Sequence, residues 1–225
     1  MWGIFMNTEL QKLKNEIHSC NKCPRLVEFR NNVLNDSNRY SGEVFWRKPI
    51  SGYGDIDGRI LIIGLAPAAS GANRTGRVFT GDKSSEFLVS CLHEVGLTSI
   101  PHSVSRDDGL EYHDSFITLA VKCVPPDNRP ETDEIRNCLP FLYREIELMP
   151  NLEKILILGG LAFNSIISYF KWKNIDVNGV KFKNNVSYEI GGKRLFCLFH
   201  PSPRNVNTGR ITREEFIETL RNVVS

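Results

Sequence analysis

The sequence predicts a three-layer α/β/α sandwich with a central, mainly parallel four-stranded sheet, and two observations indicate this fold class. Four short apolar segments rich in β-branched residues punctuate the chain, at 59–65, 115–121, 154–160 and 194–199. Because they are almost continuously hydrophobic, they suit strands that are buried on both faces, as in parallel sheets. Segments with helical periodicity lie between them, and such alternation is typical of layered α/β domains.

The helices are predicted from their own local patterns. Residues 84–95 carry apolar side chains at three- and four-residue spacing. Residues 131–148 begin with acidic residues, which suit the positive end of a helix. The remaining predictions are a leading helix over 8–32 that carries a Cys-x-x-Cys turn, helices over 161–170 and 212–224, and a polar loop or hairpin over 172–189.

Length and composition limit the class of protein. A chain of 225 residues fits one domain, which we expect to span residues 1–225. No apolar run reaches the roughly 18 to 20 residues of a membrane span, and the apolar start lacks the basic residues of a signal peptide. We therefore expect a cytoplasmic protein with no membrane partner. The net charge of +2 neither requires nor excludes a nucleic-acid partner.

Four of the six cysteines form a candidate metal site. Cys20 and Cys23 stand in a Cys-x-x-Cys pair. Cys123 follows a predicted strand, and Cys138 lies in the predicted helix that comes next. A short turn lets two thiolates share a metal, and folding can bring in the distant pair. Four thiolates suit zinc and iron–sulfur clusters alike, and the pair alone also fits a chance or redox pair. The other two cysteines lie in apolar patterns that indicate packing.

Three loops follow the carboxyl ends of predicted strands, at 66–82, 122–130 and 200–210, and ligands of open parallel sheets bind at that edge. In the first loop, small residues let backbone amides approach a phosphate or a planar base. Phe79 could stack on a base extruded from DNA, and Asp82 could orient water or stabilise a cation. The alternative is that Phe79 is a core residue and Asp82 a helix N-cap.

The third loop opens with His200 and is stiffened by two prolines. Its arginines, Arg204 and Arg210, could face phosphates, and the hydroxyls of Ser202 and Thr208 could donate to phosphate oxygens. A rigid loop of this kind could enter the minor groove and hold a base outside the stack. The alternative is a rigid surface loop with a structural histidine.

Long phrases in these loops resemble the uracil-DNA glycosylase superfamily, in particular its iron–sulfur type B branch, or family 5. They read GLAPAASGANRTGRVFTGD at 64–82, VKCVPPDNRP at 121–130 and HPSPRNVNTGR at 200–210, and the resemblance spans nearly the whole chain. Leu65 and Ala120 stand where the type A branch has an acidic residue and Asn, which favours type B. Ser70, Ser85 and residues 181–185 depart from the usual type B pattern.

The resemblance implies a monofunctional DNA glycosylase of base excision repair that hydrolyses the N-glycosidic bond of uracil in DNA. Asp82 would stabilise the sugar cation and His200 the departing base. Other lesions would be hydroxymethyluracil, ethenocytosine and hypoxanthine. The expected partners are uracil-containing DNA and a sliding clamp, and the expected state is a monomer. The remaining implied sites are base-binding Phe79, Asn128, Ala66 and Ala68, DNA-contacting Ser202, Arg204, Asn205, Thr208 and Arg210, and a structural [4Fe–4S] cluster on Cys20, Cys23, Cys123 and Cys138.

Two other classes of function remain open from the residues. An iron–sulfur protein that binds nucleic acid without catalysis would use the same loops to grip DNA and would release no base. A nucleoside or nucleotide hydrolase would use the Gly-rich loop to hold a phosphate, would act on free deoxyuridine, and would ignore duplex DNA.

Overall fold

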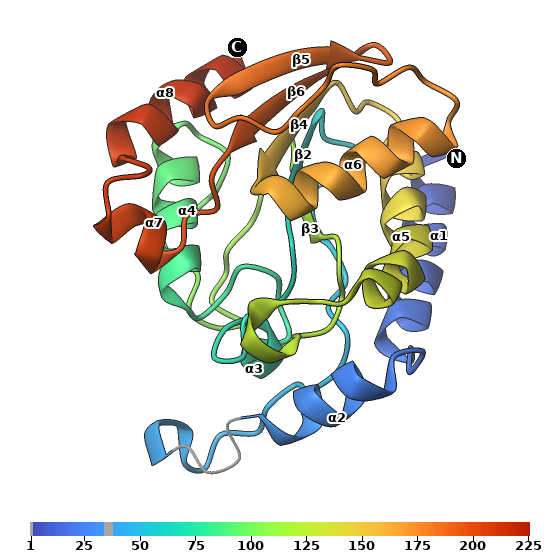
Figure 1. The fold of residues 1–225 in the computed structure, drawn as a ribbon. Coiled ribbons are helices and arrows are strands. Elements are labelled where there is room, and N and C mark those ends of the chain that lie inside the picture. Colours follow the sequence, from blue (N-terminus) through green and yellow to red (C-terminus); the bar gives the residue numbers. More distant parts are fainter. Residues whose placement is uncertain (1, 34–37) are drawn as a thin grey trace.

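A six-stranded sheet, ordered β1-β3-β2-β4-β6-β5, forms the centre of the computed structural model, which describes residues 2–33 and 38–225 (Figure 1). Its four inner strands pair in parallel, as predicted from their continuous hydrophobicity. The two edge strands, β1 and β5, are antiparallel to their neighbours. The inner strands are β2 (Ile60–Gly64), β3 (Ser115–Leu119), β4 (Lys154–Leu158) and β6 (Lys193–Leu198).

The edge strands lie outside the predicted four-stranded sheet because each lacks the pattern of a buried strand. β1 (Tyr53–Gly54) has only two residues. In β5 (Val186–Ile190) the first four residues alternate between half-buried and exposed, since one face meets solvent. It pairs with β6 through a turn of Gly191 and Gly192, both with positive φ. The region predicted as a polar loop or hairpin therefore ends in the first strand of a hairpin.

Eight α-helices and two short 3-10 turns complete the described part of the chain. The predicted leading helix is divided at the Cys-x-x-Cys turn, because Pro24 starts a second helix at a position where its missing N–H costs nothing. The helices are α1 (Trp2–His18), α2 (Pro24–Asn32), α3 (Ala72–Thr75), α4 (Lys83–Glu94), α5 (Thr132–Glu147), α6 (Gly160–Trp172), α7 (Pro203–Asn207) and α8 (Arg213–Val224); the 3-10 turns are η1 (Asn38–Tyr40) and η2 (Pro126–Asn128).

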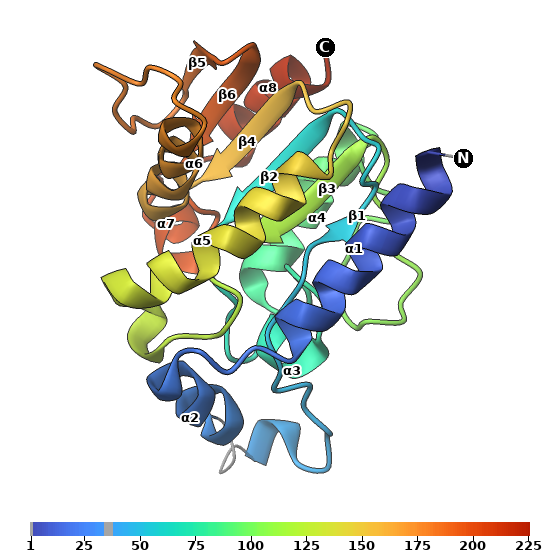
Figure 2. The same cartoon turned by 90° about the vertical axis from the view of Figure 1, so that its right-hand side faces the viewer.

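Helices cover both faces of the sheet, as Figure 2 shows most clearly. Along β2, Ile60 and Ile62 pack with residues of α4 and α8, whereas Leu61 and Ile63 pack with residues of α5 and α6. Burying each such side chain contributes roughly 1.5–3 kcal/mol, so every inner strand is stabilised from both sides. None of the described helices is both long enough and apolar enough to cross a lipid bilayer.

A buried ion pair ties the carboxyl end of β3 to α5. Lys122 and Glu145 are each 1% exposed, and Lys122 Nζ lies 2.6 Å from Glu145 Oε2 and 2.7 Å from Thr118 Oγ1. The other oxygen, Glu145 Oε1, accepts from the amide of Gly52 at 2.9 Å. Buried charges persist when they are paired and hydrogen-bonded in this way. The network fixes the backbone immediately before Cys123.

Candidate active site

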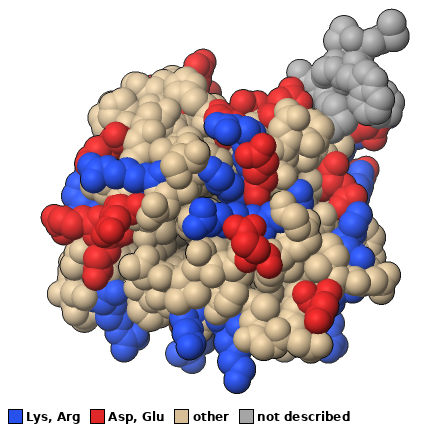
Figure 3. All heavy atoms as spheres, turned by 90° about the horizontal axis from the view of Figure 1, so that it is seen from above, with Lys and Arg blue, Asp and Glu red and all other residues tan. Residues whose placement is uncertain are grey.

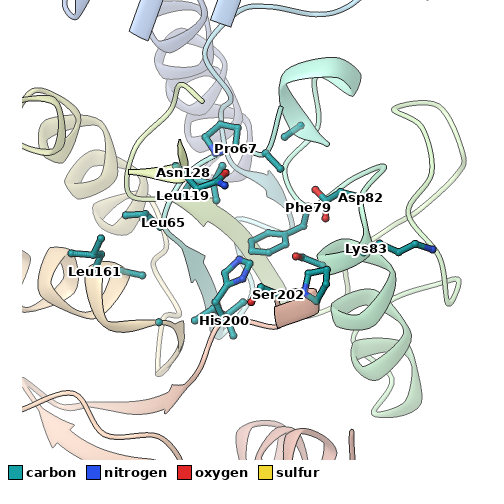
Figure 4. A pocket seen from close by; sticks show the side chains of 18 of the residues that line it. Leu65, Pro67, Phe79, Asp82, Lys83, Leu119, Asn128, Leu161, His200 and Ser202 are labelled. Carbon is teal, nitrogen blue, oxygen red and sulfur yellow. The ribbon is translucent and has the colours of Figure 1, made fainter. Parts of the chain in front are cut away.

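A cavity of about 580 Å³ opens at the carboxyl edge of the sheet (Figure 4). All three loops predicted to converge there contribute to its wall. A fourth segment, the turn between β4 and α6, also lines it and was not anticipated. Two glycines directly after a buried strand, Gly159 and Gly160, are the sequence signal that could have indicated it. The wall consists of Leu65, Ala66, Pro67, Ala68, Ser70, Ala72, Phe79, Asp82, Lys83, Ser84, Leu119, Asn128, Leu158, Gly159, Gly160, Leu161, Ala162, His200, Ser202 and Pro203.

Phe79 and His200 face each other inside this cavity. Their ring centroids are 5.9 Å apart and the planes are inclined by 26°, an offset stacked arrangement (Figure 4). Phe79 is only 7% exposed and packs with the core, as the alternative interpretation proposed. It also forms part of the cavity wall. A Cβ on Gly64 would lie 2.7 Å from Phe79 Cζ. A glycine at the end of β2 therefore makes room for the ring.

Asp82 has two roles in the structure. Its Oδ1 accepts from the amide of Ser85 at 3.0 Å and caps α4, as the alternative interpretation held. The Ser85 hydroxyl lies 3.0 Å from the amide of Asp82 and completes a capping box, which gives this departure from the type B pattern a structural role. The carboxylate also borders the cavity, and burial raises the pKa of Asp82 above its ordinary value. A raised pKa suits a group that receives a proton.

His200 carries no charge at neutral pH, because burial lowers its pKa to about 4. No described side chain or backbone group hydrogen-bonds to its imidazole nitrogens. Its backbone is held in place, since Asn205 Nδ2 donates to the carbonyl of His200 at 2.9 Å. A neutral imidazole has one N–H donor, which is therefore available to a group placed in the cavity.

The weaker base-binding candidates also lie in the cavity wall. Asn128 comes from the second loop and has a φ of +56°, in the left-handed region that Asn tolerates better than most residues. In Figure 4 it lies beside Leu119, across the cavity from His200. Ala66 and Ala68 line the same space on the first loop. Side chains from three separate loops therefore surround a space large enough for a planar ring system.

The predicted DNA-contacting residues sit on and around α7. The Ser202 hydroxyl accepts from the amide of Asn205 and caps this short helix, and the Thr208 hydroxyl donates to the carbonyl of Arg204 at 2.7 Å. These groups and the Asn205 amide therefore have intramolecular partners. Arg204 and Arg210 are exposed, and neither forms an ion pair with a carboxylate in the described ranges 2–33 and 38–225. Their guanidinium groups are available to an external anion.

The four predicted metal-binding cysteines, Cys20, Cys23, Cys123 and Cys138, line one small cavity between α2, α5 and the end of β3. Two of the sulfurs accept hydrogen bonds. Arg30 Nη1 lies 3.1 Å from Cys123 Sγ, and Asn137 Nδ2 lies 3.4 Å from Cys23 Sγ. Cys91 and Cys197 are buried in the two large core clusters, as expected for packing residues.

Four cysteine sulfurs around this small cavity form a donor set whose chemistry suits a metal ion or an iron–sulfur cluster. Among the residues with described placement, no three His, Cys, Asp or Glu side chains converge on a point that could hold a metal ion. In a four-iron cluster each thiolate binds a different iron, so the sulfurs need to surround a common space without converging on one point. Hydrogen bonds to the sulfurs, such as those from Arg30 and Asn137, are common features of such sites.

Comparisons with known proteins agree on one family. The family model described as "Uracil DNA glycosylase superfamily" matches residues 51–223. The Type-5 uracil-DNA glycosylase of Pyrobaculum aerophilum is 42% identical over 207 residues, which cover 92% of this chain and 88% of that protein. The Type-5 uracil-DNA glycosylase of Thermus thermophilus is 40% identical over 90% of this chain and 91% of its own length. The Type-4 uracil-DNA glycosylase of Sulfurisphaera tokodaii is 32% identical over 92% of this chain and 81% of its own length. The chain therefore belongs to the uracil DNA glycosylase superfamily.

Proposed function

We propose that this protein is a monofunctional uracil-DNA glycosylase that hydrolyses the N-glycosidic bond of uracil in DNA, as the first step of base excision repair. One observation carries the proposal beyond family membership. Phe79, Asp82 and His200, which come from two loops more than a hundred residues apart, line the same cavity at the edge of the sheet. A stacking ring, a carboxylate and a neutral imidazole are the groups that excision of a flipped base requires.

The reaction breaks the bond between C1′ of deoxyribose and N1 of uracil. The bonding electrons leave with the base, so positive charge develops on the sugar and negative charge on the uracil ring. The carboxylate of Asp82 stabilises the sugar cation and accepts the proton of the water whose oxygen bonds to C1′. The N–H of His200 donates to a carbonyl oxygen of the departing uracil and stabilises its anion. The backbone amides near Ala66 and Ala68 add further donors on the base side.

Phe79 would provide the face on which the extruded base stacks, and Asn128 would read its edge. The reaction needs no amine nucleophile, since water attacks C1′ directly. We therefore expect hydrolysis to end at an abasic site without cleavage of the strand.

The size and apolar wall of the cavity support a broader substrate range. A space of about 580 Å³, bordered by Leu65, Leu119 and Leu158, exceeds what one pyrimidine fills. We extend the proposal to hydroxymethyluracil, ethenocytosine and hypoxanthine. Duplexes that each carry one of these lesions test this range, and release of uracil alone would contradict it.

A single assay distinguishes the three classes of function. The purified protein is incubated with a duplex that carries one uracil, with the same duplex that carries thymine, and with free deoxyuridine. Release of uracil with formation of abasic sites only in the first sample is the expected result. Tight binding without release would indicate a non-catalytic DNA-binding protein. Hydrolysis of deoxyuridine with no action on the duplex would indicate a nucleoside hydrolase.

Replacing Gly71 with alanine is expected to lower the rate of excision at least tenfold by displacing Asp82. A Cβ at position 71 would lie 2.0 Å from Asp82 Oδ2, and no real contact is that short. The carboxylate must then turn away from the cavity, and even a small misplacement of a catalytic group is costly. The measurement is single-turnover excision of uracil from a duplex.

Gly96→Ala serves as the matched control for Gly71→Ala. This position has nothing within 4 Å of an added Cβ, and its positive φ strains the backbone outside the cavity wall. It therefore reports the effect of backbone strain alone. Equal rates for wild type and Gly71→Ala would contradict the proposal that excision depends on the position of the Asp82 carboxylate.

We further propose that Cys20, Cys23, Cys123 and Cys138 hold a structural [4Fe–4S] cluster. Their shared cavity and the donors from Arg30 and Asn137 support this assignment. When bound, the cluster would join α2 to α5 and to the end of β3, and it would take no part in hydrolysis. This role predicts an effect on stability and on the loops that its ligands anchor.

Cys138→Ser is expected to abolish the visible absorbance of the cluster, reduce the iron content and lower the melting temperature. Serine removes the thiolate that the iron requires and leaves a side chain of similar size. Cys91→Ser is the control, because that thiol is buried in the opposite core layer and should leave the iron content unchanged. Four equivalents of iron in Cys138→Ser, or zinc in place of iron in wild type, would contradict the assignment.

We also propose that the protein acts in the cytoplasm as a monomer on uracil-containing DNA and that it binds a sliding clamp. Light scattering at several concentrations tests the monomer, and co-purification with a clamp of the same source tests the second partner.

A further inference from the structure

A group of cations surrounds the Trp46 side chain outside the base cavity. The Arg106 guanidinium lies 4.6 Å from the Trp46 ring centroid and Lys48 Nζ lies 5.3 Å from it. The His18 ring meets the indole edge-on at 5.1 Å, and His18 Nε2 lies 3.1 Å from Ser51 Oγ. The aromatic ring thus holds side chains from α1 and from two loops in fixed positions through cation–π and edge contacts.

These cations lack acidic partners in the described parts of the chain. Lys48 and Arg106 form no ion pair with a described carboxylate. The carboxylates of the neighbouring loops and of α5 pair elsewhere, in Glu43–Arg74, Asp108–Arg77 and Glu145–Lys122. Concentrated charge of one sign destabilises a surface unless an anion binds.

The cation group lies close to the base cavity, because both are built on α3. Ala72, at the start of this helix, lines the cavity. Gly76, just after its end, packs on Trp46 so closely that a Cβ there would lie 2.9 Å from the indole. The amide of Trp46 donates to the carbonyl of Arg74 at 3.0 Å. A four-residue helix is only ~6 Å long, and one strand of a duplex advances ~3.4 Å per nucleotide. The cation group and the base cavity are therefore separated by a distance that a few nucleotides span.

Figures 1 and 2 both place α3 and the carboxyl end of α1 at the same end of the molecule, the end where the inner strands finish. Figure 3 shows the opposite end, where basic and acidic side chains are interspersed. A polyanion bound at the cavity therefore lies at the end of the molecule that carries the cation group. The opposite end offers only interspersed positive and negative charges.

We propose that Lys48 and Arg106, held against Trp46, bind the phosphate backbone of the DNA a few nucleotides away from the flipped base. This inference rests on the proposed function and adds a binding surface that the predicted α7 loop does not include. Phosphate groups are the ligand class because two cations at one aromatic ring suit repeated single charges along a strand.

The double variant Lys48→Ala/Arg106→Ala tests the surface. Both side chains are exposed, so their removal leaves the core intact. We expect the variant to bind a uracil-containing duplex roughly tenfold more weakly, and the slope of log affinity against log salt to become shallower by about one for each phosphate that is no longer neutralised. Lys171→Ala, an exposed lysine at the carboxyl end of α6, is the control and should keep the wild-type slope.

A neutral backbone identifies the bound group as a phosphate. Methylphosphonate linkages placed one at a time on either side of the uracil should weaken wild-type binding at certain positions and should have less effect there on the double variant. Wild-type affinity and salt slope in a double variant that melts like wild type would overturn the inference. Absence of uracil release by wild type would instead contradict the proposed function, and the salt slope would still report on this surface.

Discussion

Asp82→Asn is expected to lower the single-turnover rate of uracil excision by about a thousandfold while the protein stays folded. Asparagine caps a helix as well as aspartate does, so α4 should keep its amino-terminal hydrogen bond. What the variant loses is the negative charge beside the developing sugar cation and the acceptor for the proton of water. Binding of duplex DNA that carries an abasic site should remain.

A control separates the charge of Asp82 from its role as a cap. Thr212 caps α8 through the same type of capping box and does not line the cavity. Thr212→Ala should cost about 1 kcal/mol of stability and should leave excision unchanged. A rate for Asp82→Asn within tenfold of wild type would show that the carboxylate has no catalytic role.

The pH dependence of excision follows from the same residue. Burial raises the pKa of Asp82, and the ionised form is the active one, so the rate should rise with pH through a midpoint above the ordinary value near 4. Because the raised pKa means that ionisation is less favourable in the folded state than in the unfolded state, the stability contribution of Asp82 is lost as pH rises through that midpoint. Asp82→Asn should remove this acidic limb from the rate profile.

Replacing His200 with alanine is expected to lower the rate of excision by about a hundredfold, because the departing uracil anion loses its donor. His200→Gln, which keeps an N–H donor, should recover part of that activity. Single-turnover excision by both variants is the measurement. His113→Gln is the control, since this exposed histidine lies before β3, at the other end of the sheet. Equal rates for wild type and His200→Ala would place the stabilising donor elsewhere.

The buried imidazole also predicts how stability depends on pH. The pKa of His200 is about 4 in the folded protein and near 6.5 in the unfolded chain. The unfolded state therefore binds a proton first as pH falls, and the contribution of His200 to stability is lost between about pH 6.5 and pH 4. Melting temperatures measured across this range should fall less for His200→Gln than for wild type.

Much of the arrangement could be predicted from local patterns. The four inner strands were predictable because each is buried on both faces and so is continuously apolar. The three loops at their carboxyl ends were predictable because parallel strands end at one edge. The edge strands were not, since β1 has two residues and β5 exposes one face, which leaves no continuous apolar run.

The sequence alone determined which residues form the site, namely Phe79, Asp82 and His200. It also determined which loops carry them and at which edge of the sheet they meet. Only the tertiary structure decided how they act together. Burial makes the imidazole of His200 neutral and raises the pKa of Asp82, and close packing at Gly64 and Gly71 sets the positions of the ring and the carboxylate. The physical reason is that charge state and contact distance depend on neighbours that are distant in the chain, whereas strand patterns depend on residues that are adjacent in it.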